Sequence, residues 1–401
     1  MSARQPVLEA VLARFVEAGH SVSVEGAHLS LHNVPVLDQQ GTIQLATLIT
    51  EYSCTDAAMS VPSDHTVWYD GPEPYFCDGS SMLPAIKAAD VAGGQLSPTI
   101  PAKYHLSNKP PGYAGYALHF DKLMHYWDVL TASPAEREPS STRLPARGSM
   151  SLGTSESPFQ YEDSCSARGR FTATSARLAG HRVAIVGLGG TGSYILDHLA
   201  KTPVAEIGVF DGDVFEIHNA FRAPGAPSSR EFGRAKVSYF AEQYTRMHRN
   251  VVAYPMYVTE QNVAMLNRYD FVFICVDRGP VRRLITARLA SRPVAFADCG
   301  MDLSLAGDQS IYGSMRVTLS TPEKSDHVAH RVPTTDDEGD DLYAQNIQVS
   351  DANNLNALLA VMRWKQHLGF YSHVSKPHQL QFMIETLSLG NADCPGDSIA
   401  G

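Results

Sequence analysis

The second half of the chain alternates short apolar runs with stretches of helical periodicity. Five apolar runs of strand length follow residue 181, and the segments that separate them are long enough for helices. Strands that are apolar on both faces are typical of a sheet covered by helices on both sides, with right-handed parallel crossovers. The five runs are RVAIVG, EIGVFD, VVAYPMYV, DFVFICVD and PVAFADCG. The pattern predicts a Rossmann-like α/β domain built on a mostly parallel sheet.

The end of this region adds further elements. SIYGSMRVTL and LQFMIETLSL each predict one more strand. Residues 353–368, between them, predict an amphipathic helix with Leu355, Leu358, Leu359 and Met362 on its apolar face.

The first part of the chain has a different pattern of apolar residues and predicts different elements. A helical pattern of apolar residues covers positions 7–16, and strand-like runs such as HTVWYDG follow. We expect residues 1–130 to form a smaller α+β docking domain. Residues 131–166 are rich in Ser, Pro, Gly and Arg and predict a linker. The α/β domain is then expected at residues 167–390, with a loose tail at residues 391–401.

Composition narrows the function classes. The chain has 401 residues, a net charge of −10 and a sequence pI near 5.9, so we expect no broad binding to nucleic-acid phosphates. No apolar run approaches membrane-spanning length, and the N-terminus lacks the apolar segment of a signal peptide. The six cysteines form no Cys-x-x-Cys pair, which argues against a structural zinc site and a disulfide framework. These features favour a cytoplasmic protein that binds neither nucleic acid nor membrane.

The sequence GLGGTG lies directly after a predicted strand and directly before a predicted helix. Glycines in such a turn permit close approach of the backbone to a ligand, and a helix N-terminus presents free N–H groups to an anion. This context predicts nucleotide phosphates bound at the start of the helix. The glycines concerned are Gly187, Gly189, Gly190 and Gly192.

Two nucleotides fit this turn. In a nicotinamide-binding protein, the acidic residue at the end of the second strand binds the ribose, and Asp211 would serve. The chain continues with further polar residues that such a site does not require, namely Asp213, Asn219, Arg222 and Lys236. Each of them alone could be a loop or surface residue. Because they follow strand ends at one edge of the predicted sheet, together they favour a nucleotide site over unrelated loop and surface residues, and a nicotinamide site would not require them.

This combination of motifs resembles the ThiF, MoeB and ubiquitin-activating (E1-like) adenylyltransferase family over roughly residues 170–390. The family pattern is Gly-x-Gly-Gly-x-Gly, Asp-x-Asp, then Asn and Arg in a following turn, and Gly-x-x-Lys at the start of a helix. The family also places a magnesium-binding aspartate at the end of a later strand, where this chain has Asp277. The next residue is Arg278, where the family usually has Asn.

The resemblance implies adenylation of a carboxylate by ATP with Mg²⁺. That reaction brings two anions together and expels pyrophosphate, so it needs positive groups at the phosphates and a hard cation. Arg222 and Lys236 would clamp the phosphates, and Asp277 would hold Mg²⁺. The resemblance further implies that Asp211 and Asp213 divide the ribose and metal contacts and that Asn219 binds a phosphate.

The resemblance also implies the partners. Family members adenylate the C-terminal glycine of a small ubiquitin-like protein, and some then form a thioester on their own cysteine for an E2-like conjugating enzyme. The Cys-x-x-Cys pairs of the branch that feeds sulfur chemistry are missing. The first domain, the linker and residues 343–371 resemble E1-like proteins of bacterial ubiquitin-like conjugation operons, which are implicated in antiphage defence.

The sequence leaves undecided which cysteine, if any, would carry the thioester. In many E1 proteins it lies on a loop after the fifth or sixth strand, yet residues 301–390 contain no cysteine. Cys275 and Cys299 belong to predicted buried strands and are expected in the core. Cys394, in the tail, is either the nucleophile or an inert thiol, and in the second case the chain adenylates without its own thioester.

We expect a symmetric homodimer through the adenylation domain. The family usually supplies an arginine from the partner to the ATP phosphates, and residues 1–130 carry no second glycine turn. Arg168, Arg170 and Arg177 are the candidates for that arginine. Two other functions stay open, a nicotinamide-dependent oxidoreductase and a nucleotide-binding scaffold without catalysis. Arg278 and the missing loop cysteine would point to the scaffold.

Overall fold

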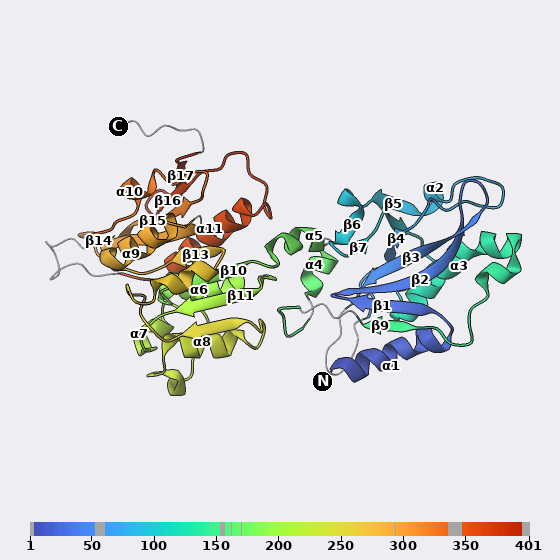
Figure 1. The fold of residues 1–401 in the computed structure, drawn as a ribbon, viewed down its shortest axis with the longest axis horizontal. Helices are drawn as coiled ribbons and strands as arrows, with labels where there is room; N and C mark the ends of the chain where they lie inside the picture. Colours follow the sequence, from blue (N-terminus) through green and yellow to red (C-terminus); the bar gives the residue numbers. More distant parts are fainter. Residues whose placement is uncertain are drawn as a thin grey trace. The chain divides into compact units, whose positions relative to one another are not determined.

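The computed structural model describes residues 4–52, 61–152, 157–161, 163–169, 171–292, 294–335 and 347–394. It divides into two compact units, residues 1–176 (unit 1) and 177–401 (unit 2), shown in Figure 1.

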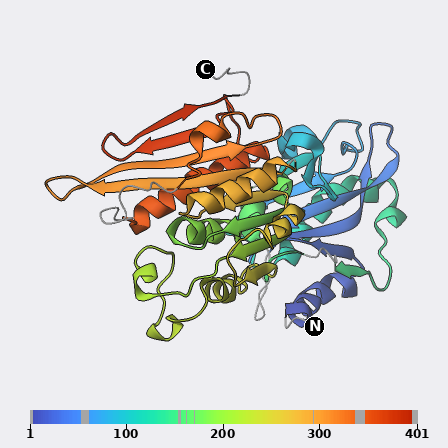
Figure 2. The ribbon, with the colours of Figure 1, turned by 60° about the vertical axis from the view of Figure 1, so that its left-hand side comes forward.

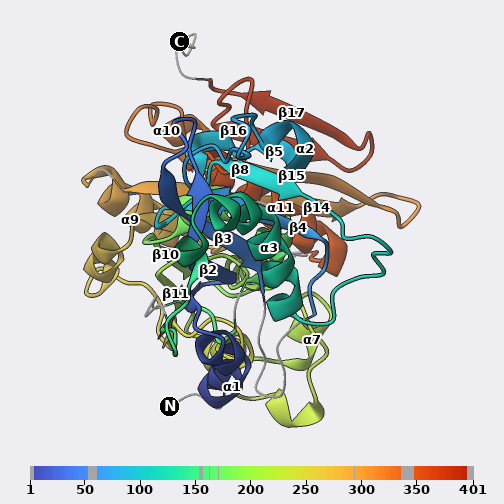
Figure 3. The same cartoon turned by 90° about the vertical axis from the view of Figure 1, so that its right-hand side faces the viewer.

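Unit 1 is a seven-stranded sheet in the order β5-β8-β4-β3-β2-β1-β9, in which β1 and β9 are parallel and the other neighbours antiparallel. Helix α3 packs against β2 and β3 (Figure 3), and α1 packs against β1. The strands are β1 (Ser21–Glu25), β2 (His28–Leu37), β3 (Ile43–Glu51), β4 (Thr66–Asp70), β5 (Lys87–Asp90), β8 (Tyr104–Ser107) and β9 (Met150–Leu152), with a separate β6 (Gln95–Ser97) and β7 (Ile100–Pro101) pair. The helices are α1 (Arg4–Glu17), α2 (Leu83–Ile86), α3 (His119–Arg137), α4 (Ser164–Arg168) and α5 (Thr172–Ser175), with single turns η1 (Ala92–Gly94) and η2 (Pro139–Thr142).

Much of the predicted linker is part of unit 1. Helix α3 continues to Arg137, and its residues Thr131, Ser133 and Pro134 are buried. Strand β9 then adds to the sheet beside β1. Small side chains fill a closely packed interior as well as large ones do, so the low apolar content of this segment did not reveal its packing.

The middle of α3 carries a fully buried lysine. The side chain of Lys122 has no exposed surface, and its Nζ lies 3.1 Å from Asp64 Oδ1 and 3.8 Å from Glu51 Oε2. Burial alone would raise the pKa of Asp64, but the Lys122 charge and hydrogen bonds from Thr66 outweigh it and lower that pKa below its ordinary value of 3.8. A buried lysine with two carboxylates is stable only while all its partners are present.

Replacing Lys122 by methionine is therefore expected to destabilise unit 1 by about 3–5 kcal/mol, because the Glu51 and Asp64 carboxylates lose their counter-charge. Urea unfolding of the full chain measures this loss. The matched control is Lys87→Met, which removes a surface pair with Asp90 (3.2 Å) and should cost less than about 1 kcal/mol. Equal effects of the two variants would contradict the argument.

The ion pair between Lys122 and Asp64 makes the stability of unit 1 depend on pH. Because the folded pKa of Asp64 is lowered, its contribution to stability is present above pH 3.8 and is lost as the pH falls below that value. We expect Asp64→Asn to remove part of the acid-induced loss of stability of unit 1 below pH 4. An unfolding midpoint whose pH dependence is unchanged in Asp64→Asn would refute this assignment.

Unit 2 contains the predicted α/β domain. Its eight strands are in the order β12-β11-β10-β13-β14-β15-β16-β17; the first five are parallel to one another, and the last three join antiparallel. The strands are β10 (Arg182–Val186), β11 (Glu206–Phe210), β12 (Val251–Tyr254), β13 (Phe271–Ile274), β14 (Ala295–Leu305), β15 (Ile311–Ser320), β16 (Gln379–Met383) and β17 (Ser388–Ala392). The predicted last strand is thus a hairpin, β16–β17, which includes the first two residues of the predicted tail. Figure 2 shows the β14–β15 hairpin extending beyond the rest of the sheet.

Helices cover both faces of this sheet. One core contains side chains of α6, α8 and α11, and a second core on the opposite face contains side chains of α9 and η5. The helices are α6 (Gly190–Leu199), α7 (Ile217–Ala220), α8 (Lys236–Tyr244), α9 (Gly279–Ala290), α10 (Val328–Arg331) and α11 (Ser350–His367), with single turns η3 (Ala176–Leu178), η4 (Ser229–Glu231) and the longer η5 (Val263–Arg268). Across both units, no helix within the described ranges combines the length and apolar character needed to cross a membrane.

Helix α11 lies at the predicted place but with a different face inward. Leu358 and Met362, expected on the apolar face, are 37% and 48% exposed. The buried face instead carries small residues such as Ala357 and Ala360 and the indole of Trp364. Small side chains allow α11 to pack closely on α6, which large leucines would prevent.

Candidate functional site

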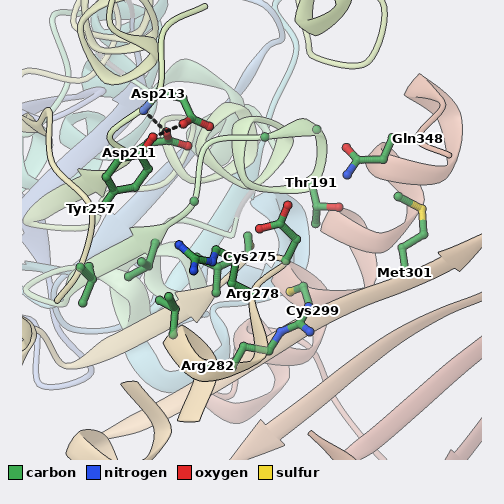
Figure 4. Close-up of a pocket in the computed structure, with 18 of the residues that line it drawn as sticks. Thr191, Asp211, Asp213, Tyr257, Cys275, Arg278, Arg282, Cys299, Met301 and Gln348 are labelled. Atoms are coloured by element: carbon green, nitrogen blue, oxygen red, sulfur yellow. Dashed lines mark hydrogen bonds between the residues drawn. The ribbon is translucent and has the colours of Figure 1, made fainter. Parts of the chain in front are cut away.

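The carboxyl ends of β10, β11, β13 and β14 open into one cavity of about 1590 Å³ (Figure 4). Parallel strands end at the same edge of a sheet, so residues from distant parts of the chain meet there. Most of the predicted site residues line this cavity, namely Gly187, Gly189, Gly190, Asp211, Asp213, Arg222, Lys236 and Asp277.

The glycine turn has the close backbone contacts that its sequence predicts. Gly187 has a φ of +93°, and a Cβ there would lie 2.6 Å from the carbonyl oxygen of Cys275. A Cβ at Gly192 would lie 1.9 Å from the carbonyl oxygen of Gly187. Gly192 does not line the cavity, so its role is to let α6 start directly beneath the turn.

Asp211 fixes the loop that follows β11 to the glycine turn. Its Oδ2 accepts a hydrogen bond from the backbone N–H of Leu188 (2.7 Å), and its Oδ1 accepts one from the N–H of Asp213 (2.8 Å). Burial raises the pKa of Asp211, although Lys236 and these N–H donors act in the opposite direction. The remaining lone pairs of the carboxylate can still accept hydrogen bonds from a ribose.

Asp213 is held between a cation and a phenol. Its Oδ2 accepts a hydrogen bond from Lys236 Nζ at 2.6 Å, and its Oδ1 accepts one from the Tyr257 hydroxyl. Burial opposes ionisation, but these two donors outweigh it and lower the pKa of Asp213. Each carboxylate oxygen therefore already accepts one hydrogen bond, which makes Asp213 an anchor for Lys236 and leaves the remaining lone pairs for the metal contact that the sequence suggested.

The Tyr257 ring also explains Gly212. A Cβ at Gly212 would lie 2.6–2.7 Å from ring atoms of Tyr257, so the ring rests directly on the backbone between the two aspartates. Figure 4 shows Tyr257 beside Asp211 and Asp213 at one end of the cavity. Tyr257 was not among the residues predicted from the sequence, although its position three residues after the end of β12 places it at the same sheet edge.

Arg222 lines the cavity, where the charges of two carboxylates act on it. Burial lowers the pKa of Arg222, and the charges of Asp277 and Asp213 act to raise it. Its Nε is buried and has no hydrogen-bond partner among the described residues. A buried guanidinium N–H without a partner is costly unless an anion takes it up, which fits a phosphate.

Asp277 is the carboxylate that best fits a divalent cation. It follows β13, lines the cavity and is exposed there, and within the described ranges its carboxylate makes no hydrogen bond or ion pair. Carboxylate oxygen is the ligand that Mg²⁺ prefers, with the other positions taken by water and substrate phosphates.

Besides Gly192, two predicted residues lie outside the cavity lining. Asn219 is 3% exposed and caps α7, where its Oδ1 accepts a hydrogen bond from the N–H of Glu216 at 2.8 Å. Cys394 follows β17, the edge strand of the sheet, which is separated from the cavity-lining strand β14 by β15 and β16. It lies near Arg363 of α11. The structure thus gives Asn219 a capping role and brings Cys394 to a different part of unit 2.

The arginines proposed to act across a dimer are only partly described. Arg177 donates a hydrogen bond to the carbonyl oxygen of Gly369 within unit 2. Arg170 and the side chain of Arg168 lie outside the described part of the structure.

The cavity continues well past Asp277. Its second half is lined by the first turns of α9, the β14–β15 hairpin and the residues around the start of α11, and Figure 4 shows Met301 and Gln348 at the end opposite Tyr257. Arg282 enters this half from α9, whereas Arg278, the residue before that helix, is close enough to Tyr257 for its charge to act on the phenol. The other residues of this half are Met301, Asp302, Leu303, Tyr312, Ile347, Gln348 and Asn356.

The two thiols expected in the core border this second half. Cys275 directly follows β13 and lies beside Cys299 of β14, and the interaction between the two thiols together with burial raises the pKa of Cys275 well above its ordinary range. Nearby, the buried Asp298 is paired with Arg282 (3.3 Å) and Arg316 (2.7 Å). Figure 4 shows Arg282 directed towards Cys299. A thiol with a raised pKa carries little thiolate, so Cys275 suits a structural role.

Comparisons with known proteins agree with the motifs. Residues 168–339 match the ThiF family, and residues 10–164 match a domain of unknown function, DUF6791. The adenylyltransferase and sulfurtransferase UBA4 of Saccharomyces cerevisiae (strain YJM789) is 33% identical over 117 residues, which are 28% of this chain and 26% of the relative. The adenylyltransferase and sulfurtransferase MOCS3 of Mus musculus is 33% identical over 141 residues, 34% of this chain and 30% of the relative. The chain thus spans under a third of the length of these relatives.

Solved structures resemble the chain more distantly. Escherichia coli MccB with ATP gives a TM-score of 0.41 at 16% identity, covering 57% of this chain and 69% of MccB. PaaA gives a TM-score of 0.44 at 16% identity, covering 55% of this chain and 75% of PaaA. Likeness at this level says nothing about substrate.

The family match covers the glycine turn, the cations and Asp277, and the motifs around them are those by which the sequence resembled this family. Residues 168–339 of this chain therefore belong to the ThiF/MoeB/E1-like family.

Proposed function

We propose that this chain uses ATP to adenylate the C-terminal glycine carboxylate of a small ubiquitin-like protein. The observation that carries the proposal is the single cavity in which the glycine turn, Arg222, Lys236 and Asp277 share one end. Its volume of about 1590 Å³ exceeds the roughly 300–1,000 Å³ usual for one small molecule, so it has room for a nucleotide and a second substrate.

In this proposal the two ends of the cavity hold the two reactants. The ATP phosphates bind at the glycine turn, where Lys236 and Arg222 compensate their charge, and the acceptor tail enters along α9 and the β14–β15 hairpin. An acceptor carboxylate oxygen attacks the α-phosphorus, and the bond to the pyrophosphate oxygen breaks. Mg²⁺ at Asp277 would supply charge neutralisation on the phosphates. Asp211 positions the ribose and keeps the glycine turn in place.

The proposal extends to the fate of the acyl-adenylate. We infer transfer of the activated protein to an E2-like enzyme through a cysteine thioester, in a bacterial ubiquitin-like conjugation system with a role in antiphage defence. We also infer that two copies associate through the adenylation domain. The adenylyltransferase relatives and the cations beside Asp213 support ATP over NAD as the nucleotide.

The test is ATP–pyrophosphate exchange with the purified chain and small ubiquitin-like proteins whose C-terminal glycine is free. Exchange is expected only when such a protein and Mg²⁺ are both present, and removal of the terminal glycine should abolish it. NAD reduction in place of exchange would overturn the proposal, as would ATP binding without exchange for every such acceptor.

Cys394→Ala tests the route after adenylation. Because Cys394 lies away from the cavity, we expect the variant to keep wild-type pyrophosphate exchange. If Cys394 is the nucleophile, a reductant-sensitive adduct with the acceptor disappears in this variant, as seen on non-reducing gels. An adduct that persists in Cys394→Ala excludes it as the nucleophile, and the Cys165→Ala variant serves as the control for an exposed thiol elsewhere.

A further inference from the structure

The start of α11 is packed against the glycine turn through one buried asparagine. Asn353 is 1% exposed and lies in the first turn of the helix. Its amide explains why residue 190 has no side chain, because a Cβ at Gly190 would lie 2.2–2.4 Å from the amide atoms of Asn353. The contact therefore depends on glycine in the turn and asparagine in the helix together.

Each end of this amide has a partner in the nucleotide site. Asn353 Oδ1 accepts a hydrogen bond from the Thr191 hydroxyl at 3.0 Å. Asn353 Nδ2 donates to the carbonyl oxygen of Val349 at 3.0 Å, in its own helix, and to that of Arg222 at a longer 3.5 Å. The two carbonyl acceptors require the NH₂ group, so they fix the orientation of the amide. One side chain thus joins the glycine turn, the backbone of Arg222 and α11.

Neighbouring residues of α11 face the other half of the cavity. Ile347 and Gln348 precede the helix and line the second half. Asn356, one turn after Asn353, lines the same half, and its Nδ2 donates to the carbonyl oxygen of Gly300 at 3.1 Å. The first turns of α11 therefore contact both halves of the cavity, and Asn353 is the link to the phosphate half.

We propose that Asn353 is a positioning residue that holds Arg222 and the glycine turn in the geometry for binding ATP phosphates, and that it couples this geometry to α11. The inference rests on the proposed nucleotide function of the cavity. Asn353 touches no substrate; it acts through the Arg222 backbone and the Thr191 side chain. A buried amide with both ends bonded resists movement, since breaking either bond leaves a buried polar group without a partner.

The test is direct binding of Mg-ATP and of adenosine to the full chain by titration calorimetry, without any acceptor. Asn353→Ala is expected to weaken Mg-ATP binding about tenfold, which corresponds to the loss of one buried hydrogen bond, and to leave adenosine binding unchanged. A general loosening of the fold would weaken both ligands equally. Thermal unfolding of each variant shows whether it remains folded.

A double-mutant cycle makes the assignment sharper. If Asn353 acts through Arg222, Asn353→Ala should have little further effect on Mg-ATP binding once Arg222 is replaced by alanine. Asn353→Asp retains the acceptor for Thr191 but not the donor for the Arg222 carbonyl, so it should rescue only part of the affinity. Gly190→Ala should mimic Asn353→Ala, because its methyl group displaces the same amide.

The possible outcomes separate this inference from the proposed function. Wild-type affinity for Mg-ATP in folded Asn353→Ala overturns the inference and leaves the proposed function standing. Additive effects of Asn353→Ala and Arg222→Ala overturn the part of the inference in which Asn353 acts through Arg222. Absence of Mg-ATP binding to the wild-type chain would instead refute the nucleotide site itself. The control variant is Asn354→Ala, the next residue on the helix, whose Oδ1 contacts His198 at 3.1 Å and which should bind Mg-ATP normally.

Discussion

Asp277→Ala is expected to abolish ATP–pyrophosphate exchange, with a loss of at least about a hundredfold, while the chain remains folded. The carboxylate is exposed in the cavity and faces Arg222, so its removal should remove the metal ligand without disturbing a core. A second measurement does not need an acceptor: Mg²⁺ should strengthen ATP binding to the wild-type chain and should have little effect on binding to Asp277→Ala. Asp277→Asn, which keeps the shape and loses the charge, should behave in the same way.

The control for this variant is another carboxylate of the same cavity. Asp302 lies on the β14–β15 wall, in the second half, and Asp302→Ala should keep the Mg²⁺ effect on ATP binding. Wild-type exchange by Asp277→Ala would refute the role of Asp277. Loss of the Mg²⁺ effect in both variants would show that the two halves of the cavity are wrongly assigned.

Lys236→Ala is expected to weaken ATP binding by about a hundredfold or more. The lysine is 6% exposed and pairs with Asp213 at 2.6 Å, so its removal takes away a phosphate ligand and leaves a carboxylate without its cation. Equilibrium binding of Mg-ATP measures the loss. Lys201→Ala, which removes an exposed lysine that pairs with Asp197 at the same 2.6 Å, should bind ATP normally.

The Asp213→Asn variant separates two possible roles of Lys236, binding phosphate and balancing the charge of Asp213. In this variant the carboxylate that needs a counter-charge is gone. If Lys236 binds phosphate, Lys236→Ala should still weaken ATP binding strongly in this background. If it only balances Asp213, the further loss should nearly vanish, which would contradict the phosphate role.

Much of unit 2 could be predicted because its signals are local. The apolar runs fixed the strands β10 to β14 in order, and the glycines between β10 and α6 identified the turn. The strand-end rule then placed Asp211 and Asp277 at one edge without any knowledge of contacts, and the family motifs added Arg222 and Lys236. The family match over residues 168–339 confirms the family that these residues indicated.

The errors concern packing between distant segments. Residues 131–137 were predicted to belong to a linker but form the end of α3. Several of their small side chains are buried there, because small side chains can pack as closely as large ones. Leu358 and Met362 are exposed because α11 meets α6 through alanines. Asn219 has the residue type of a phosphate ligand, but its amide is used to cap α7.

The sequence by itself determined the fold class of unit 2 and the place of the glycine turn. These follow from periodicity and from the order of strands, which each short segment carries on its own. The residues expected to bind phosphate and metal came from the resemblance to a family and stay predictions. Only the tertiary structure decided which protein partners these groups have. Tyr257 and Lys236 each bond one oxygen of Asp213, and Asn353 contacts Thr191 from 162 positions away. Such pairings depend on which side chains meet in space, and a linear pattern of polar and apolar positions does not encode that directly.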